Sequence, residues 1–263
     1  MMDFTLNTYK KLLLAFKSAD YTFQTFEQFL SQPAVGKVVV LRHDVDLKPQ
    51  NALSVAQLEK DLAVRSVYYF RAVRESWDEA VIKEIAAMGH EVGYHYESLT
   101  TAKGDVQAAY DDFVSNLAKL RKLVPVHTIC MHGSPRSKYD SKNIWKHFSY
   151  RDLDIIGEPY FDVDFSKMFY LTDTGRRWDG YKVSVRDKIE RYQDAWIQKG
   201  LVYHSTNDII NAISNGSLPE RLMLTTHPQR WTDNKFLLLK EYLLQSAKNV
   251  VKRFLAHRSA AVS

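Results

Sequence analysis

Short apolar runs rich in β-branched and aromatic residues alternate along this chain with longer segments of helical periodicity. The runs have the length and composition of buried strands and lie at 38–41, 67–70, 91–94, 128–131 and 222–225. Apolar residues recur at helical spacing between them, over 50–63, 78–88 and 105–122. Strands that alternate with helices in this way predict an α/β fold with a parallel sheet.

Helices are also predicted at both ends of the chain, over 5–16, 25–30 and 234–257. The signal is weaker in the middle, where we expect strands at 168–171 and 202–203 and a helix over 186–199. We therefore expect one barrel domain over 1–263, with the N-terminal helices (1–35) and a C-terminal helix (234–258) packed on it.

Composition narrows the class of protein. The chain has 263 residues, 45% of them hydrophobic, and a single cysteine, Cys130, so it carries no internal disulfide framework. The start lacks a basic, apolar signal segment, and no apolar stretch approaches the roughly 20 residues that span a bilayer; we expect a cytoplasmic protein. The net charge of +5 is spread along the chain without a nucleic-acid motif, so a nucleic-acid role ranks last.

Acidic and imidazole side chains stand where the predicted strands end. Parallel strands bring their carboxyl ends to one rim, and side chains two apart on an extended segment point the same way. Imidazole and carboxylate groups with an open position are the ligands of a catalytic divalent cation, so the rim predicts a metal site. The residues concerned are Asp44, Asp46, His95, Glu97, His132 and His227.

Five segments resemble, in order, the motifs of the polysaccharide deacetylase superfamily (NodB homology, carbohydrate esterase family 4). They are 39–46 (VVLRHDVD), 89–95 (GHEVGYH), 130–135 (CMHGSP), 173–178 (DTGRRW) and 222–228 (LMLTTHP). The resemblance covers roughly 37–230. It implies a distorted (β/α) barrel of the NodB type and metal-dependent hydrolysis of N-acetyl, formyl or O-acyl groups on sugars.

The same resemblance implies metal ligands. His95 matches the first metal histidine, and Asp46 takes the role of a family aspartate that falls on Val45 here. The second metal histidine falls on Leu99, which cannot bind a cation. We therefore predict His132 as the third ligand, with Glu97 in reserve, and zinc as the ion, with cobalt, manganese or nickel as alternatives.

Catalytic roles follow in the same way. Asp44 matches the catalytic base and His227 the general acid, and Asp173 or Trp178 is expected to orient His227. Residues near the rim are expected to contact substrate: Arg42, His43, Arg136, Arg177, Trp178 and Trp231. For Arg42 and His43, a structural ion pair is the alternative.

The sequence thus predicts a hydrolase that removes an acetyl or formyl group from an N-acylated sugar. A nucleotide- or lipid-linked precursor of a surface polysaccharide, such as the O-antigen of lipopolysaccharide, is the expected substrate. Leu99 keeps an inactive sugar-binding or scaffold protein open, and another metal-dependent amide or ester hydrolase is a further alternative. The oligomeric state does not follow from the sequence.

Overall fold

A parallel sheet organises the fold. The computed structural model describes residues 3–32, 35–133, 137–178 and 189–234, together with Phe236 and Leu238. Within this part the strands are β1 (Thr22–Gln24), β2 (Val38–Val45), β3 (Val67–Phe70), β4 (Glu91–Tyr96), β5 (Ile129–Met131), β6 (Phe169–Thr172) and β7 (Arg221–Thr226). The alternating pattern of the sequence is therefore confirmed.

The sheet curls into a half-barrel. The order of the strands is β5-β4-β3-β2-β7-β6, and every pairing in the described residues is parallel. The short β1 pairs with residues 38–40 of β2, while β3 pairs with residues 42–45. The edge strands β5 and β6 do not pair with each other in the described chain, so the barrel is open. The predicted distorted (β/α) barrel is confirmed.

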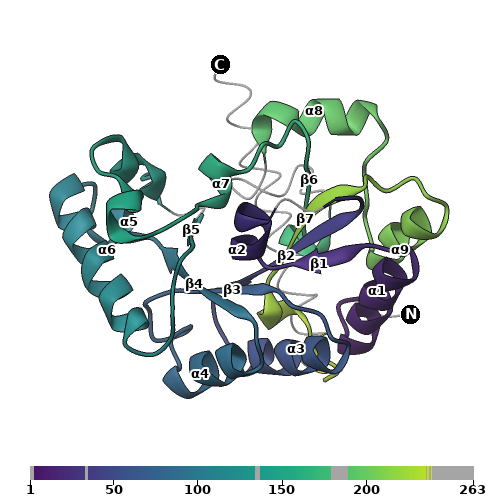
Figure 1. Ribbon diagram of the computed structural model, residues 1–263, viewed down its shortest axis with the longest axis horizontal. Helices are drawn as coiled ribbons and strands as arrows, with labels where there is room; N and C mark the ends of the chain where they lie inside the picture. The colour runs from purple at the N-terminus through teal and green to yellow at the C-terminus, as the bar shows by residue number, and fades with distance from the viewer. Residues whose placement is uncertain are drawn as a thin grey trace.

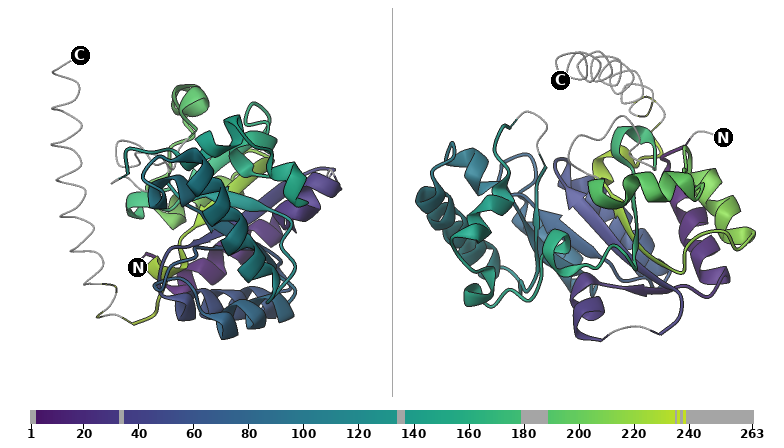
Figure 2. Two further views of the ribbon diagram at one scale, coloured as in Figure 1. Left: turned by 90° about the vertical axis from the view of Figure 1, so that its left-hand side faces the viewer. Right: turned by 90° about the horizontal axis from the view of Figure 1, so that it is seen from above.

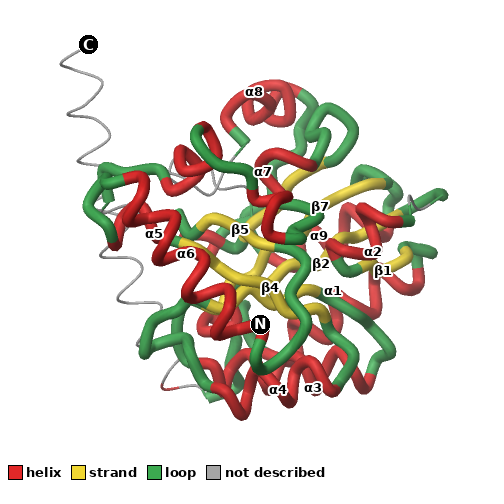
Figure 3. The backbone as a smooth tube through the Cα atoms, turned by 60° about the vertical axis from the view of Figure 1, so that its left-hand side comes forward, coloured by secondary structure: helices red, strands yellow, loops and turns green. Residues whose placement is uncertain are grey.

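Five helices form an arc around the outside of the strands (Figure 1). They are α1 (Leu6–Ser18), α3 (Pro49–Asp61), α4 (Glu79–Ala87), α6 (Val106–Arg121) and α9 (Thr206–Ser214). The tube view shows the strands enclosed by helices and loops (Figure 3), and the view from above shows the same arrangement (Figure 2). None of the helices in the described ranges combines the length and hydropathy needed to cross a bilayer.

The remaining helices and turns complete the described chain. They are α2 (Phe26–Ser31), α5 (Ser98–Thr101), α7 (Pro159–Asp162), α8 (Glu190–Gln198) and the 3-10 turns η1 (Ser141–Lys146), η2 (Tyr150–Leu153), η3 (Thr174–Arg176) and η4 (Pro228–Arg230).

Local signals explain where the helices begin and end. Asp105 caps α6 because its side chain accepts a hydrogen bond from the backbone of Ala108, so the helix itself starts one residue later than predicted. Gly89 follows the end of α4 with φ of +90°, a conformation that favours glycine after a helix.

The two faces of β2 have different chemistry. Every residue of the strand is buried, as expected when both faces of a parallel sheet are covered. Arg42 and Asp44 point to the inner face of the half-barrel, whereas His43 points to the helices and contacts Glu59 of α3. The parity of the strand therefore separates His43 from its two neighbours.

Gly93 in β4 allows a close approach inside the half-barrel. A Cβ atom at this position would lie 2.3 Å from the ring of Tyr69 and 2.8 Å from the backbone oxygen of Thr128. The Tyr69 ring packs in that space, and its hydroxyl is hydrogen-bonded to that of Thr128 at 3.0 Å. The same ring lies beside His95, two residues farther along β4, with ring centroids 6.4 Å apart.

Not every predicted element is found. Residues 202–203 are not a strand, because the backbone there forms no ladder and instead leads into the cap of α9. Most of the predicted helix at 234–258 lies outside the described residues, and so does the first part of 186–199. The single-domain organisation over 1–263 stays a prediction.

A buried carboxylate joins α3 to the outer face of the sheet. Glu59 is 0% exposed and accepts hydrogen bonds from four side chains. The donors are His43 at 2.7 Å, Ser66 at 2.6 Å, Tyr68 at 2.8 Å and Tyr9. Burial alone would raise the pKa of Glu59, but the charge and hydrogen bond of His43 outweigh it and lower the pKa from 4.5 to about 2.

The pH dependence of stability should report this network. Because the pKa of Glu59 is depressed on folding, its contribution is fully present above its unfolded pKa and is lost as the pH falls toward the folded value. The difference between 4.5 and about 2 corresponds to about 3 kcal/mol. Denaturant titrations at pH 7, 5 and 3 should show little change between pH 7 and 5, a loss of about 2 kcal/mol by pH 3 in the unaltered chain, and a flatter profile in Glu59→Gln. An equally steep loss in Glu59→Gln contradicts the assignment.

Candidate metal and catalytic site

Three side chains from different strand ends meet at the rim of the half-barrel. Asp46 follows β2, His95 lies near the end of β4, and His132 follows β5. The Nε2 atoms of His95 and His132 lie 3.7 Å and 3.4 Å from Asp46 Oδ1. One ligand atom from each residue lies within 4.8 Å of the others, so the structure brings the three predicted ligands together.

Both histidines are oriented by hydrogen bonds from their other ring nitrogen. His95 Nδ1 donates to the backbone oxygen of Cys130 at 2.9 Å, and His132 Nδ1 donates to Glu97 at 3.0 Å. Arg71 holds Glu97 in turn, with contacts of 2.6 Å and 3.0 Å. These bonds leave Nε2 of each ring free toward Asp46, the arrangement that metal-binding histidines adopt.

The donor set fits a divalent cation. Asp46 Oδ1 is buried and has no hydrogen-bond partner in the described structure, although two imidazole nitrogens face it. Burial, followed by the neighbouring His132, lowers the pKa of His95 well below its usual value, so the ring is neutral. A carboxylate and two imidazoles that turn their Nε2 atoms toward it are suited to a cation between them.

Glu97, which was predicted as the reserve ligand, is committed to other partners. Its carboxylate is occupied by His132 and Arg71, and these partners outweigh burial and lower its pKa to about 2. Glu97 therefore lies behind His132 and orients its ring, whereas His132 turns its Nε2 atom toward Asp46.

Asp44 lies beside this group on the inner face. Its carboxylate receives two hydrogen bonds from Arg42, at 2.8 Å and 2.6 Å, and both side chains are almost fully buried. Asp44 Oδ2 also lies 3.6 Å from His95 Nε2. The paired guanidinium fixes the carboxylate in one orientation. Arg42, 1% exposed, is thus in the ion-pair role and is not available to contact substrate.

A second pair lies on the other side of Asp46. His227 Nδ1 is hydrogen-bonded to Asp173 at 2.6 Å, and His227 Nε2 lies 3.8 Å from Asp46 Oδ2. Burial and the charge of Arg230 oppose protonation of this imidazole, but Asp173 outweighs them and raises the pKa of His227. The structure therefore gives His227 the environment of a proton donor, with Asp173 as its orienting partner.

Several partners of this pair were not predicted from the sequence. Asp173 is 0% exposed, and it accepts hydrogen bonds from Arg230 at 2.5 Å and from the indole of Trp231 at 2.9 Å. Gln229 donates to Asp46 Oδ2 at 3.2 Å. Arg230, Trp231 and Gln229 lie just after β7, as His227 does, so the rule that polar residues after a strand end converge at the rim also applies to them. The same rule applies to Arg71, which directly follows β3.

Other expected substrate contacts lie elsewhere. His43 is 0% exposed on the helix side of the sheet, and Trp178 and Trp231 are core residues that are 0% and 1% exposed. Trp178 donates to Thr206, not to His227. None of these three rings can stack on a sugar without unpacking the core. Arg177 is accessible and contacts His204 at 2.5 Å, and Arg136 lies outside the described residues.

Leu99 is turned away from the site. It lies on α5 and is 4% exposed in a small apolar cluster with Ala109 and Ile144. The position that matches the second metal histidine of the family therefore belongs to the core here. His132, from the neighbouring strand end, is the second imidazole that lies beside Asp46.

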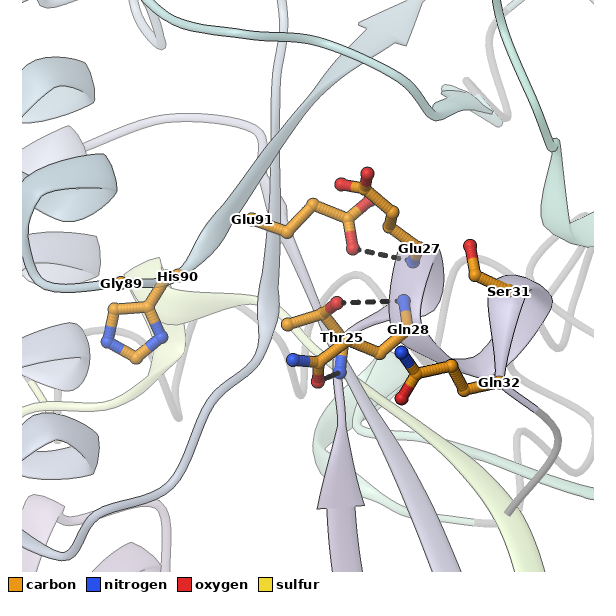
Figure 4. A pocket seen from close by; sticks show the side chains of 8 residues that line it. All are labelled: Thr25, Glu27, Gln28, Ser31, Gln32, Gly89, His90 and Glu91. Atoms are coloured by element: carbon orange, nitrogen blue, oxygen red, sulfur yellow. Dashed lines mark hydrogen bonds between the residues drawn. The ribbon is translucent and has the colours of Figure 1, made fainter.

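A cavity of about 450 Å³ opens at the opposite end of the strands (Figure 4). It lies beside α2 and the start of β4, and Glu91 is its most buried acidic group. Burial raises the pKa of Glu91 to about 7, although the backbone of Glu27 and the hydroxyl of Thr128 donate to its oxygens. Because the polar groups are already satisfied by one another, we assign no chemistry to this end.

Comparisons with solved structures find distant similarity. BA3943 from Bacillus anthracis, described as a CE4 family pseudoenzyme, is 12% identical over 80% of this chain, with a TM-score of 0.44. A BA3943 mutant described as having restored enzymatic activity gives the same identity and TM-score. A variant of the peptidoglycan deacetylase PdaC from Bacillus subtilis is 11% identical over 83% of this chain and 96% of its own, with a TM-score of 0.39.

The chain spans about 60% of the BA3943 chain. No protein-family model and no curated protein sequence matches it. BA3943 carries the family name that the sequence motifs suggest, but such low identities and TM-scores decide neither family nor activity. Function is therefore argued from the site.

Proposed function

We propose that this protein is a metal-dependent hydrolase that removes an N-acyl group, acetyl or formyl, from a sugar. The observation that carries the proposal is the unpartnered Asp46 Oδ1, which faces the free Nε2 atoms of His95 and His132. Asp44 lies beside His95 of this group, and His227 lies beside Asp46. A base and an acid beside a cation site are suited to hydrolysis of an amide.

Each flanking residue has a distinct task. Asp44, fixed by Arg42, keeps one lone pair on each oxygen and accepts a proton from the water that attacks the acyl carbon. His227 donates the proton on Nε2 to the leaving nitrogen, while Asp173 keeps Nδ1 protonated and stabilises the imidazolium. Without that proton the amine is a poor leaving group, so amide cleavage depends on His227.

Asp46, His95 and His132 would hold the cation, which we propose to be zinc, with cobalt, manganese or nickel as alternatives. When bound, it supplies Lewis-acid polarisation of the acyl carbonyl and makes water more acidic. The second carboxylate oxygen of Asp46 is held by Gln229, which restricts rotation of the ligand.

The sugar class rests on the resemblance of the five sequence motifs to polysaccharide deacetylases. A nucleotide- or lipid-linked precursor of a surface polysaccharide, such as the O-antigen of lipopolysaccharide, is the substrate class that we propose first. In that setting the enzyme acts in the cytoplasm, before the polymer is assembled.

Metal analysis tests the core of this proposal. The purified chain should bind about one equivalent of zinc, cobalt, manganese or nickel, and His132→Ala should lower that content together with acyl release from a panel of N-acylated nucleotide sugars. His127→Ala is the matched control, because that histidine is exposed and pairs with Glu27 at the opposite end of the sheet. Elemental analysis and assays for free acetate and formate provide the two measurements.

The outcomes separate the alternatives. A chain that binds no metal and releases no acyl group, yet binds N-acylated sugars, is an inactive sugar-binding or scaffold protein. Metal-dependent release from simple amides or esters, without any preference for sugars, points to another hydrolase on the same scaffold. Equal metal content in His132→Ala and His127→Ala shows that His132 is not a ligand.

A further inference from the structure

A thiol lies next to the candidate metal centre. Cys130 is opposite His95 in the pairing of β4 with β5, so both side chains occupy the inner face of the half-barrel. The sulfur of Cys130, a ring nitrogen of His95 and a carboxylate oxygen of Asp44 lie within 4.8 Å of one another. These side chains therefore form a second set of metal donors, which shares only His95 with the first.

The second set differs from the first in depth and in chemistry. Its three residues are 0–4% exposed, whereas the side chains of Asp46 and His132 are 20% and 15% exposed at the rim. Thiolate is a soft ligand that selects thiophilic cations, while carboxylate and imidazole alone discriminate less. The deeper set is therefore the one that a soft cation prefers.

We propose that Asp44, His95 and Cys130 form a site for a soft divalent cation such as cadmium. Binding breaks the S–H bond of Cys130 and forms a sulfur–metal bond, and the proton leaves to solvent, so no oxidant or reductant is needed. The thiolate and the carboxylate then face the two charges of the ion and the charge of Arg42, which leaves one positive charge in excess. Both oxygens of Asp44 accept from Arg42, yet each keeps a lone pair for the ion.

Occupation of this site has a consequence for the reaction. His95 has one free ring nitrogen, because its Nδ1 is committed to the backbone of Cys130, so the two sets compete for it. Asp44 bound to a cation can no longer accept a proton from water. Soft cations should therefore inhibit by displacing the ion at the rim and withdrawing the base. This consequence rests on the proposed function, whereas the binding itself does not.

Cadmium titration of the chelator-treated protein tests the site, with the ultraviolet charge-transfer absorption of cadmium thiolate as the readout. Cys130 is the only cysteine of the chain, so the band can come from no other residue. We expect about one equivalent to develop the band. His95→Ala should weaken the apparent affinity by about tenfold or more, and His132→Ala should leave the band in place.

Cys130→Ser is the matched control. It should lose the band but still bind zinc through the rim residues, which shows that the fold is intact. Should His95→Ala fail to fold, Asp44→Asn gives the same test of the neighbouring ligand. The inference is overturned by the absence of a band in the unaltered chain, or by unchanged cadmium affinity in both the His95 and Asp44 variants.

The result is independent of the proposed activity. A cadmium band with the expected variant pattern, in a protein that hydrolyses nothing, supports this site and removes the proposed function. Zinc-dependent deacylation without a cadmium band keeps the proposed function and removes this site.

Discussion

Replacing Asp44 by asparagine is expected to lower the rate of deacylation by about 10²–10⁴-fold, the contribution of a positioned general base. The variant keeps the size of the side chain and one oxygen for Arg42, but its amide cannot accept the proton of the attacking water. Because Asp44 is not in the rim set of ligands, the zinc content should stay at the unaltered level. Steady-state rates and elemental analysis of the same preparation measure both.

The control for this substitution is Asp61→Asn, at the exposed end of α3, where the side chain accepts a bond from Gln57. It removes the same charge far from the rim and should change neither rate nor metal content. If Asp44→Asn retains more than about a tenth of the rate, the base is a different group. If it loses its zinc, Asp44 is a ligand and the assignment of Asp46 needs revision.

The parts of the site that the sequence could predict share one physical rule. Parallel strands end at one rim, so polar residues after apolar runs converge even when they are far apart in sequence. Asp46, His95 and His132 come together in this way, and so do Asp173 and His227. This prediction used no distances between residues, only the position at which each strand ends.

The sequence does not predict in which direction a side chain near the rim points or how far it extends. His43 lies within β2, where neighbouring residues point to opposite faces, and its ring pairs with Glu59 under α3. This is the structural ion pair that was the alternative to substrate contact. The indoles of Trp178 and Trp231 adjoin rim motifs in sequence but point into the core. The position at which a strand ends predicts where the backbone lies, but only the packing of the whole domain decides where a long side chain points.

Hydrogen-bond partners were the least predictable feature. For Arg42 the sequence left substrate contact and a structural ion pair open, and the structure shows the ion pair, with Asp44 two residues away on the same face of β2. The link from Arg71 through Glu97 to His132 joins three strand ends, and no single motif contains it. Such bonds depend on the curl of the sheet, which sets how closely side chains from neighbouring strand ends approach one another.

Asp173→Asn provides a test that depends on the leaving group. We expect the rate on an N-acyl sugar to fall by about 10²–10⁴-fold, because a neutral amide no longer stabilises the imidazolium of His227 that donates from Nε2. An activated ester such as 4-nitrophenyl acetate expels a stable anion and needs no proton. Its hydrolysis should fall by less than about tenfold in the same variant.

This difference separates positioning of the acid from damage to the structure. Asp173 is buried and also bonded to Arg230 and Trp231, so a variant that merely loosens this corner would slow both substrates alike. Trp231→Phe is the matched control, because it removes one hydrogen bond to Asp173 and keeps the carboxylate that holds His227. It should slow both reactions to a similar, small extent. Equal losses on amide and ester in Asp173→Asn contradict the role of His227 as the proton donor, because that role predicts a penalty only where the leaving group is an amine.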